Sequence, residues 1–359
     1  MRDVLIGEDS LAFTNKHMLV RFADTRQVMS TSVLNGGYRE DLMGVFNYDE
    51  KPEDGSRCEM RASTYLEHMA LVAAELGLDA GRFCGLSTAA GMEYTATAAM
   101  TYGGIVVTAV VTAGLNGNAG RAGDPAAWNE GETTGERRDY QPGTINIFLF
   151  IDAGLLPGTM TRAIVTGTEA KTAAIQEFLV PSRYSSGLAT GSGTDGFVVV
   201  ANPRSPVTLT DAGKHSKLGE LIGRTVTAAV KEALTRHTGL CMRSQHCVEV
   251  RMGRYGVTEE RLYAAVHAKM PERNMSPPDF FRVLAQREER TPLVAYTSCY
   301  VHLLDQLQWG LLTGGEAAAA AGGLLETLSG GFGAPKSGTA DLNTLIQWYV
   351  DAVAGLLSE

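Results

Sequence analysis

The sequence predicts an α+β fold, with a mixed or largely antiparallel sheet covered by helices and an α-helical region at the C-terminal end. Two observations predict this fold class. Strands follow one another in the first part of the chain and then alternate with helices, which is typical of α+β proteins. From Thr258 onward, only a helical spacing of apolar residues remains. We therefore expect an α+β domain over residues 1–240 and a helical appendage over residues 241–359.

The spacing of apolar residues defines the elements of the first part of the chain. It predicts a hairpin over residues 18–33 and a helix over residues 65–78. Two long strands are expected over residues 93–100 and 105–113. A short, strongly apolar run over residues 144–151 fits a strand that is buried on both faces.

A helix is expected after the break at Pro157, with Thr159 as its N-cap and an end near Leu179, before Pro181. At 3.6 residues per turn, this helix places Lys171 in the middle of an apolar stripe. A lysine there either snorkels to solvent or points into a polar pocket beside the core. The stripe consists of Met160, Ile164, Ile175 and Phe178, with Thr168 at its edge.

Polar residues gather after this helix. The segment 182–196 is rich in Ser, Thr and Gly, which allows backbone N–H groups and hydroxyls to approach a ligand closely. Asp195 ends this segment just before an expected strand over 197–201. A carboxylate in this position is often functional, although a turn at Thr-Asp-Gly explains it equally well. Glu169 falls on the side of its helix opposite Lys171 and is expected to be a solvated carboxylate.

A histidine stands at the start of the next expected helix. His215 and Ser216 open a run with apolar residues at helical spacing. The positive end of a helix dipole disfavours the imidazolium form, so a neutral His215 could act as a base or a donor near pH 7. The alternative interpretation is that His215 is a surface histidine near a helix cap without a functional role.

The C-terminal region is predicted to be helical throughout. Its Gly-rich segment 330–339 is similar to a rearranged phosphate loop, but the lysine precedes the last glycine instead of following it. A flexible linker is therefore the better interpretation of that segment. The expected helices cover residues 259–269, 279–312 with a break at Pro292, 316–328 and 341–357.

Composition limits the classes of partner. The chain has 359 residues, of which 44% are hydrophobic, and a net charge of −9, which disfavours nucleic acids and anionic membranes. No segment approaches the roughly 20 apolar residues of a membrane span, and the N-terminal residues lack the apolar core of a signal peptide. Five scattered cysteines indicate reduced thiols. We expect a cytoplasmic protein without a nucleic-acid or membrane partner.

Motif searches predict no metal site. The cluster His237, Cys241, His246 and Cys247 matches no standard zinc spacing. The chain also contains neither a G-x-S-x-G elbow nor an H-E-x-x-H motif. Hydrolytic chemistry, if present, is therefore expected to depend on other side chains.

Several short blocks recur in a fixed order along the first two thirds of the chain. They cover residues 34–37, 122–125, 143–146, 168–172, 180–185, 189–196 and 215–220. In this order they resemble the adenosylcobinamide amidohydrolase family. The resemblance extends over residues 11–239 and is weakest near the N-terminus and in the acidic insertion 128–140.

This resemblance implies a corrinoid-salvage enzyme, a C–N hydrolase that acts on a linear amide. Its substrate would be adenosylcobinamide, and its products would be adenosylcobyric acid and aminopropanol. The corrinoid is then substrate, so we expect no cofactor and no metal, and a homo-oligomer is compatible with the chain. The alternative is a non-catalytic corrinoid-binding or trafficking protein, in which the polar loop only cradles the amide arms of the ring.

Amide hydrolysis needs a base and donors for the developing oxyanion. Asp195 or His215 is the candidate base, and Lys171 or Thr194 is a candidate donor. A covalent route through Thr194 or a loop serine is open if His215 lies within hydrogen-bonding reach. Glu169 completes the catalytic candidates. The resemblance adds substrate-binding candidates: Asn35, Gly36, Gly37, Asp124, Thr168, Ser182, Arg183, Tyr184 and Ser216.

Overall fold

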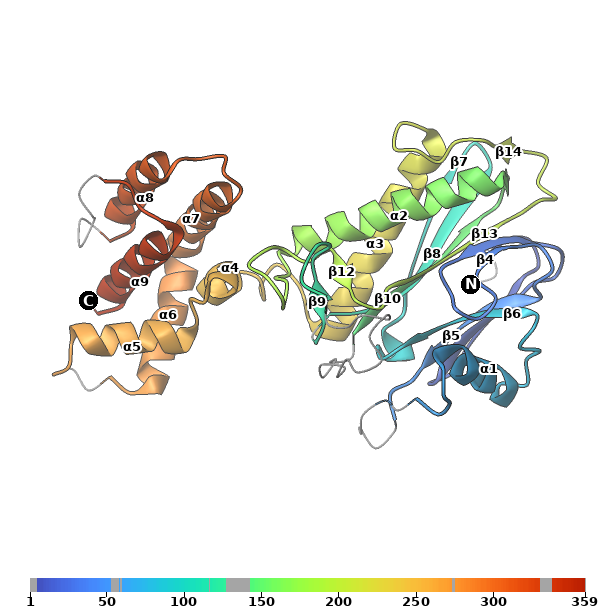
Figure 1. Ribbon diagram of the computed structural model, residues 1–359, viewed down its shortest axis with the longest axis horizontal. Helices are drawn as coiled ribbons and strands as arrows, with labels where there is room; N and C mark the ends of the chain where they lie inside the picture. The colour runs from blue at the N-terminus through green and yellow to red at the C-terminus, as the bar shows by residue number, and fades with distance from the viewer. Residues whose placement is uncertain are drawn as a thin grey trace. The chain divides into compact units, whose positions relative to one another are not determined.

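A computed structural model describes residues 5–52, 58, 60–115, 117–126, 143–272, 275–329 and 338–358 (Figure 1). The chain divides into two units, Met1–Leu240 and Cys241–Glu359. The acidic insertion 128–140 and most of the expected linker 330–339 lie outside the described residues.

The first unit is organised around strand β10 (Thr144–Ile151), every residue of which is buried, as its apolar sequence predicted. β10 pairs antiparallel with β8 (Ile105–Gly114) and parallel with β13 (Gly196–Ala201). These strands belong to a six-stranded sheet in the order β4-β3-β13-β10-β8-β7. The mixed sheet confirms the expected α+β class. Its other strands are β3 (Gln27–Ser30), β4 (Gly37–Arg39) and β7 (Ala96–Tyr102).

Two helices, α2 (Pro157–Glu177) and α3 (Lys217–Thr238), cover one face of this sheet and pack against each other (Figure 1). The face that they cover carries the alternate residues of β10 that begin with Ile145. α2 approaches the sheet closely at Gly167, where a Cβ would lie 2.3 Å from the ring of Phe197. A glycine at this position therefore sets the distance between the helix and the sheet.

A second sheet lies against the other face. It contains β1 (Ser10–Phe13), β2 (His17–Arg21), β5 (Gly44–Asp49) and β6 (Phe83–Thr88), in that order. Its inner side chains share a buried cluster with Phe148 of β10 and Val198 of β13. Helix α1 (Tyr65–Glu75) packs on its far side through Met69 and Val72, which share a buried cluster with Phe46. The unit is thus a four-layer stack of helix, sheet, sheet and helix.

Short elements complete the first unit. β9 (Ala119–Gly120) pairs antiparallel with β12 (Gly191–Ser192), and β11 (Gly154–Leu155) pairs parallel with β14 (Thr208–Leu209). A 3₁₀ turn covers Met92–Tyr94. The β9–β12 pair lies beside the first residues of β10 and β13.

The hairpin predicted over residues 18–33 is wrong. β2 and β3 belong to different sheets, because both edges of β2 are already taken by β1 and β5. A buried ion pair holds the connection between them. Arg26 donates to both carboxylate oxygens of Asp9, at 3.0 and 2.9 Å. The chain therefore crosses from one sheet to the other instead of folding back.

Two helix boundaries also differ from the sequence prediction. α2 begins at Pro157 with Leu156 as its N-cap, so the expected cap at Thr159 is wrong. Proline suits the first helical position, because the N–H that it lacks has no helical partner there. α1 ends before residue 78, because Gly77 adopts a φ of 69° that ends the helical turn.

The second unit is helical, as predicted, and α6 and α7 are separated at Pro292. Its apolar residues form a core of their own around the fully buried Tyr300 and Tyr349. Within the described part of the chain, no helix is both long and apolar enough to span a bilayer. The helices are α4 (Val248–Met252), which the sequence did not indicate, α5 (Glu259–Lys269), α6 (Pro277–Arg290), α7 (Leu293–Gln308), α8 (Gly314–Ser329) and α9 (Leu342–Ser358), with a 3₁₀ turn at Gly253–Tyr255.

The Asp9–Arg26 pair generates a stability prediction. Asp9→Ala leaves Arg26 buried without its counter-charge, which should lower the free energy of unfolding by about 3–5 kcal/mol. Glu75→Ala is the matched control, because it removes a carboxylate from an exposed pair with Arg61 and should cost at most about 1 kcal/mol. Urea unfolding of both variants measures the difference. Equal losses would contradict the role given to the buried pair.

Candidate active site

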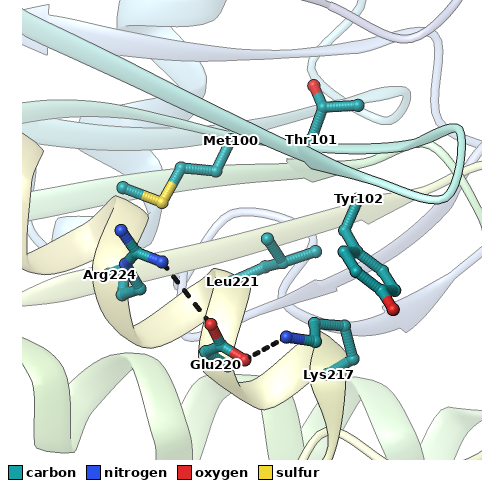
Figure 2. A pocket seen from close by; sticks show the side chains of 7 residues that line it. All are labelled: Met100, Thr101, Tyr102, Lys217, Glu220, Leu221 and Arg224. Carbon is teal, nitrogen blue, oxygen red and sulfur yellow. Dashed lines mark hydrogen bonds and ion pairs between the residues drawn. The ribbon is translucent and has the colours of Figure 1, made fainter.

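A hollow between the edge strand β7 and helix α3 has a volume of about 370 Å³ (Figure 2). Its charged residues neutralise one another, because Glu220 bonds Lys217 at 2.5 Å and Arg224 at 3.5 Å. Lys217 also lies 4.6 Å from the centre of the Tyr102 ring. None of the residues expected at the active site lines this hollow. Its lining residues are Met100, Thr101, Tyr102, Lys217, Glu220, Leu221 and Arg224.

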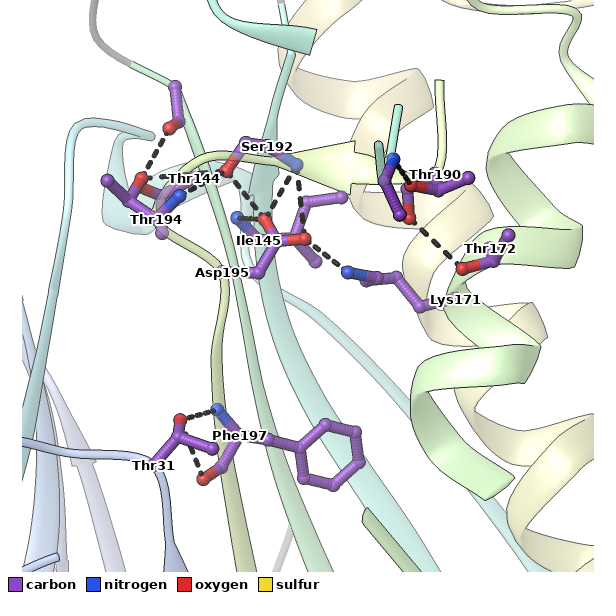
Figure 3. Close-up of polar contacts among 12 residues, drawn as sticks. Thr31, Thr144, Ile145, Lys171, Thr172, Thr190, Ser192, Thr194, Asp195 and Phe197 are labelled. Carbon is purple, nitrogen blue, oxygen red and sulfur yellow. Dashed lines mark hydrogen bonds and ion pairs between the residues drawn. The ribbon is translucent and has the colours of Figure 1, made fainter. Parts of the chain in front are cut away.

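A polar cluster lies instead where β10 and β13 begin, beside α2 (Figure 3). Its centre is an ion pair between Lys171 Nζ and Asp195 Oδ2. The residue Lys171 is only 7% exposed. Of the two orientations that the sequence left open for Lys171, the structure therefore shows the inward one. The lysine interrupts the apolar stripe of α2 because a carboxylate faces it.

The carboxylate of Asp195 is held from several sides. Oδ1 accepts hydrogen bonds from Ile145 N and Ser192 N, both at 3.1 Å, and from Ser192 Oγ at 2.6 Å. The first of these follows from strand pairing. Asn146 pairs with Gly196, so the residues that precede them, Ile145 and Asp195, also lie close together at the sheet edge. The site thus contains a fixed anion with a fixed counter-charge.

Gly191 allows this pair to form. A Cβ on Gly191 would lie 2.2 Å from Asp195 Oδ2 and 2.6 Å from Lys171 Nζ, closer than atoms can approach. The β9–β12 pairing fixes the position of this glycine. Of the many glycines in the polar loop, this one is required by close contact with the charged groups.

A row of hydroxyls extends from the carboxylate toward the start of β10 (Figure 3). Ser192 Oγ lies 3.5 Å from Thr194 Oγ1, which lies 2.5 Å from Thr144 Oγ1. Thr194 Oγ1 also donates to the carbonyl oxygen of Gly143 at 2.9 Å. Thr194 is exposed, Ser192 is half-buried and Thr144 is buried. The row therefore connects solvent with the buried end of the strand.

Several expected substrate-binding residues lie in the loops around β9 and β12. Asp124 Oδ2 accepts from Ser182 Oγ at 2.5 Å and from Arg121 N at 2.7 Å. Burial acts to raise the pKa of Asp124, but the hydrogen bonds from serine hydroxyls outweigh it and hold the pKa below its ordinary value. Arg183 N donates to Ala119 O at 2.9 Å, and the neighbouring Tyr184 is exposed.

The block Asn35-Gly36-Gly37 shapes a turn. Asn35 adopts a φ of 55° and donates through Nδ2 to Ala80 O and Phe83 O, at 2.6 and 2.8 Å. A Cβ on Gly36 would lie 1.9 Å from a backbone oxygen, and Gly37 adopts a φ of 78°. Backbone geometry thus accounts for all three residues.

Within the described residues, four of the expected site residues form no hydrogen bond with the ion pair: Thr168, Glu169, His215 and Ser216. Thr168, Glu169 and His215 are exposed, and Glu169 forms a 2.6 Å ion pair with Lys214, as expected for a solvated carboxylate. Ser216 caps α3 by accepting from Gly219 N at 3.0 Å, which confirms the predicted helix start. Among the residues that the structure describes, none of these four donates to or accepts from Lys171 or Asp195.

The structure specifies the contacts of three residues to which the sequence assigned no individual role. Ser192 and Thr144 stand in Ser/Thr-rich or apolar runs where no spacing distinguishes them. Asn118 is 1% exposed and donates through Nδ2 to Gly143 O at 2.6 Å. Nothing in the local sequence indicated these contacts, because each of them depends on pairing between distant segments. Over the described ranges, no group of three or more His, Cys, Asp or Glu side chains could hold a metal ion.

Comparison with known proteins gives a matching family and a relative. A family model described as adenosylcobinamide amidohydrolase matches residues 3–242. The uncharacterized protein MJ1613 of Methanocaldococcus jannaschii is 32% identical over 243 residues, which are 64% of this chain and 89% of that protein.

Two solved structures are also similar. The PH0078 protein from Pyrococcus horikoshii OT3 has a TM-score of 0.31 at 11% identity, over 66% of this chain and 82% of that one. The L-aminopeptidase D-Ala-esterase/amidase from Ochrobactrum anthropi, described as a variant of the Ntn hydrolase fold, has a TM-score of 0.28 at 13% identity, over 64% and 82%.

Gly191 generates a prediction about the ion pair. Gly191→Ala should push Lys171 and Asp195 apart and lower the free energy of unfolding by about 3 kcal/mol, the effect of breaking a buried pair. Gly223→Ala is the control, because no atom lies within 4 Å of the added Cβ and alanine favours the helix. Urea unfolding compares the two. A Gly191 variant as stable as the control would refute the close contact.

Proposed function

The chain belongs to the adenosylcobinamide amidohydrolase family, and from this membership we propose that it hydrolyses the aminopropanol amide of adenosylcobinamide. The products would be adenosylcobyric acid and aminopropanol, released in corrinoid salvage in the cytoplasm. The family model covers residues 3–242, so we assign the reaction to the first unit.

The observation that carries this proposal is the fixed Asp195 carboxylate with a hydroxyl directly on it. Ser192 Oγ donates to Asp195 Oδ1 at 2.6 Å. A carboxylate at this distance can take the proton of an attacking oxygen. Lys171 compensates the charge of Asp195 and keeps its orientation. We therefore propose Asp195 as the base and Lys171 as its positioning residue.

The hydroxyl row supplies the other groups that amide hydrolysis needs. The attacking oxygen is a water bound to this row, or a hydroxyl of the row that forms an ester, which a water molecule then hydrolyses. Its proton passes to Asp195 through Ser192. Exposed Thr194 is the proposed donor to the oxyanion that forms on the scissile carbonyl. When the C–N bond breaks, the proton returns to the aminopropanol nitrogen.

Substrate contacts are proposed for the loops beside this row. The exposed side chains of Arg183 and Tyr184 stand at the rim, and the Asp124–Ser182 hydrogen bond fixes the loop that carries them. Amide arms of a corrinoid are donors and acceptors, so these polar groups suit them. We propose no cofactor, no metal and no nucleic-acid or membrane partner for the reaction.

Hydrolysis of adenosylcobinamide is the first prediction for the proposed function. Purified protein should release aminopropanol from adenosylcobinamide without added nucleotide, and activity should survive exhaustive chelation because protein groups supply the base and the donor. Mass analysis of the corrinoid measures the product. Tight binding with unchanged substrate would contradict hydrolysis and favour the alternative, a corrinoid-binding or trafficking protein. Activity lost on chelation and restored by one divalent ion would overturn the metal-free route.

Variants of the charged cluster test the assigned roles. Asp195→Asn and Ser192→Ala should each lower turnover by about 100-fold or more, because general-base catalysis contributes at least that much. Glu177→Gln is the matched control, since Glu177 is an exposed carboxylate of α2 that also pairs with a lysine. Its turnover should equal that of the unmodified protein.

His215→Ala separates the two candidate bases. We expect a smaller loss of turnover than in Asp195→Asn, because no described hydrogen bond connects exposed His215 to the cluster. Circular dichroism of each variant checks that it is folded. Normal turnover in Asp195→Asn together with a large loss in His215→Ala would transfer the role of base to the histidine.

A further inference from the structure

Two side-chain donors, one from buried Asn118 and one from exposed Thr194, converge on a single backbone carbonyl. Gly143 O accepts from Asn118 Nδ2 at 2.6 Å and from Thr194 Oγ1 at 2.9 Å. Gly143 is also buried and directly precedes strand β10. Two donors at such distances polarise a carbonyl and would stabilise negative charge on its oxygen, which is the arrangement of an oxyanion hole.

The position of Asn118 leaves one of its buried side-chain atoms without a hydrogen bond among the described residues. The side chain is 1% exposed, and within the described part of the chain its Oδ1 has no hydrogen-bond partner. An unpaired buried acceptor costs about 1–3 kcal/mol, so such a group calls for an explanation. Glycine at position 143 permits the contact, since a Cβ would lie 2.2 Å from Asn118 Oδ1.

The residue after this carbonyl carries a hydroxyl held at the same point. Thr144 Oγ1 lies 2.5 Å from Thr194 Oγ1, the atom that also bonds Gly143 O. Thr194 therefore connects the carbonyl with the hydroxyl of the next residue. A threonine hydroxyl is a weak nucleophile that becomes effective when a neighbouring group takes its proton. Thr194 Oγ1 is placed to accept that proton, because its own hydrogen is donated to Gly143 O.

We propose that the peptide bond between Gly143 and Thr144 is a self-cleavage site. Thr144 Oγ1 attacks the carbonyl carbon of Gly143, and the proton of this hydroxyl ends on the amide nitrogen of Thr144. The C–N bond breaks and an ester forms between Gly143 and Thr144 Oγ1. One water molecule then hydrolyses the ester, which leaves a carboxylate on Gly143 and a free α-amine and hydroxyl on Thr144.

This activity goes beyond the proposed function, because the bond that breaks belongs to the chain itself. It is measured without a corrinoid, so its failure and the failure of amide hydrolysis are separate results. The full-length protein is purified and incubated, and intact mass is followed over time. We expect fragments 1–143 and 144–359 whose masses sum to that of the intact chain plus one water. N-terminal sequencing of the larger fragment should begin Thr-Ile-Asn-Ile-Phe.

Variants identify the chemistry. Thr144→Val, which keeps the shape of the side chain but lacks the hydroxyl, should give no fragments, and Thr144→Ser should still cleave. Asn118→Ala should slow cleavage by about 100-fold or more, the effect of removing one oxyanion donor. Thr172→Ala is the matched control, because that hydroxyl bonds a different carbonyl, Thr190 O, at 3.0 Å. It should cleave at the unmodified rate.

Three results would overturn the proposal. The folded, unmodified protein could keep its full mass after prolonged incubation. The larger fragment could begin at a residue other than Thr144, which would indicate a protease. Thr144→Val, folded by circular dichroism, could cleave at the same rate as the unmodified chain. Asn118→Ala with an unchanged rate would remove Asn118 from the mechanism and contradict the oxyanion hole.

Discussion

A lysine buried in a helix needs a counter-charge, and the candidate site is built around this requirement. Removing an ammonium and a carboxylate from water is unfavourable unless the two charges pair and their remaining bonds are satisfied. Lys171 and Asp195 meet this condition through each other and through backbone donors from Ile145 and Ser192. Asp195 in turn fixes Ser192, and the loop that carries Ser192 also positions Thr194.

The parallel pairing of β10 with β13 supplies the geometry for this pair. Among the described strands of the six-stranded sheet, only β10 and β13 pair in parallel and therefore begin at the same edge. Thr144 is the first residue of β10, and Asp195 directly precedes β13. The two residues therefore lie near each other although they are distant in the sequence. Gly167 lets α2 come close to the sheet, four residues before Lys171 enters the site.

Sequence patterns predicted those features that depend mainly on residues close together in the chain. Lys171 interrupts an apolar stripe and Asp195 ends a polar loop, and both patterns identified these residues as candidates. The break at Pro292 was predicted because proline ends helices. The hairpin over residues 18–33 failed because the choice of strand partner depends on β1 and β5, which the spacing did not show. The contacts of Ser192, Thr144 and Asn118 could not be predicted for the same reason. Their contacts exist only after β9, β10 and β12 have assembled.

Among the residues that the structure describes, the helices of the second unit bury their apolar stripes in a core made of residues of that unit alone. Over the described ranges, the cores of the first unit likewise contain no residue from beyond Leu240. The family model ends at residue 242, close to the same division. Recombination of genes near this point would separate two sets of packing interactions without cutting through either. The packing within each unit is therefore independent of the packing within the other.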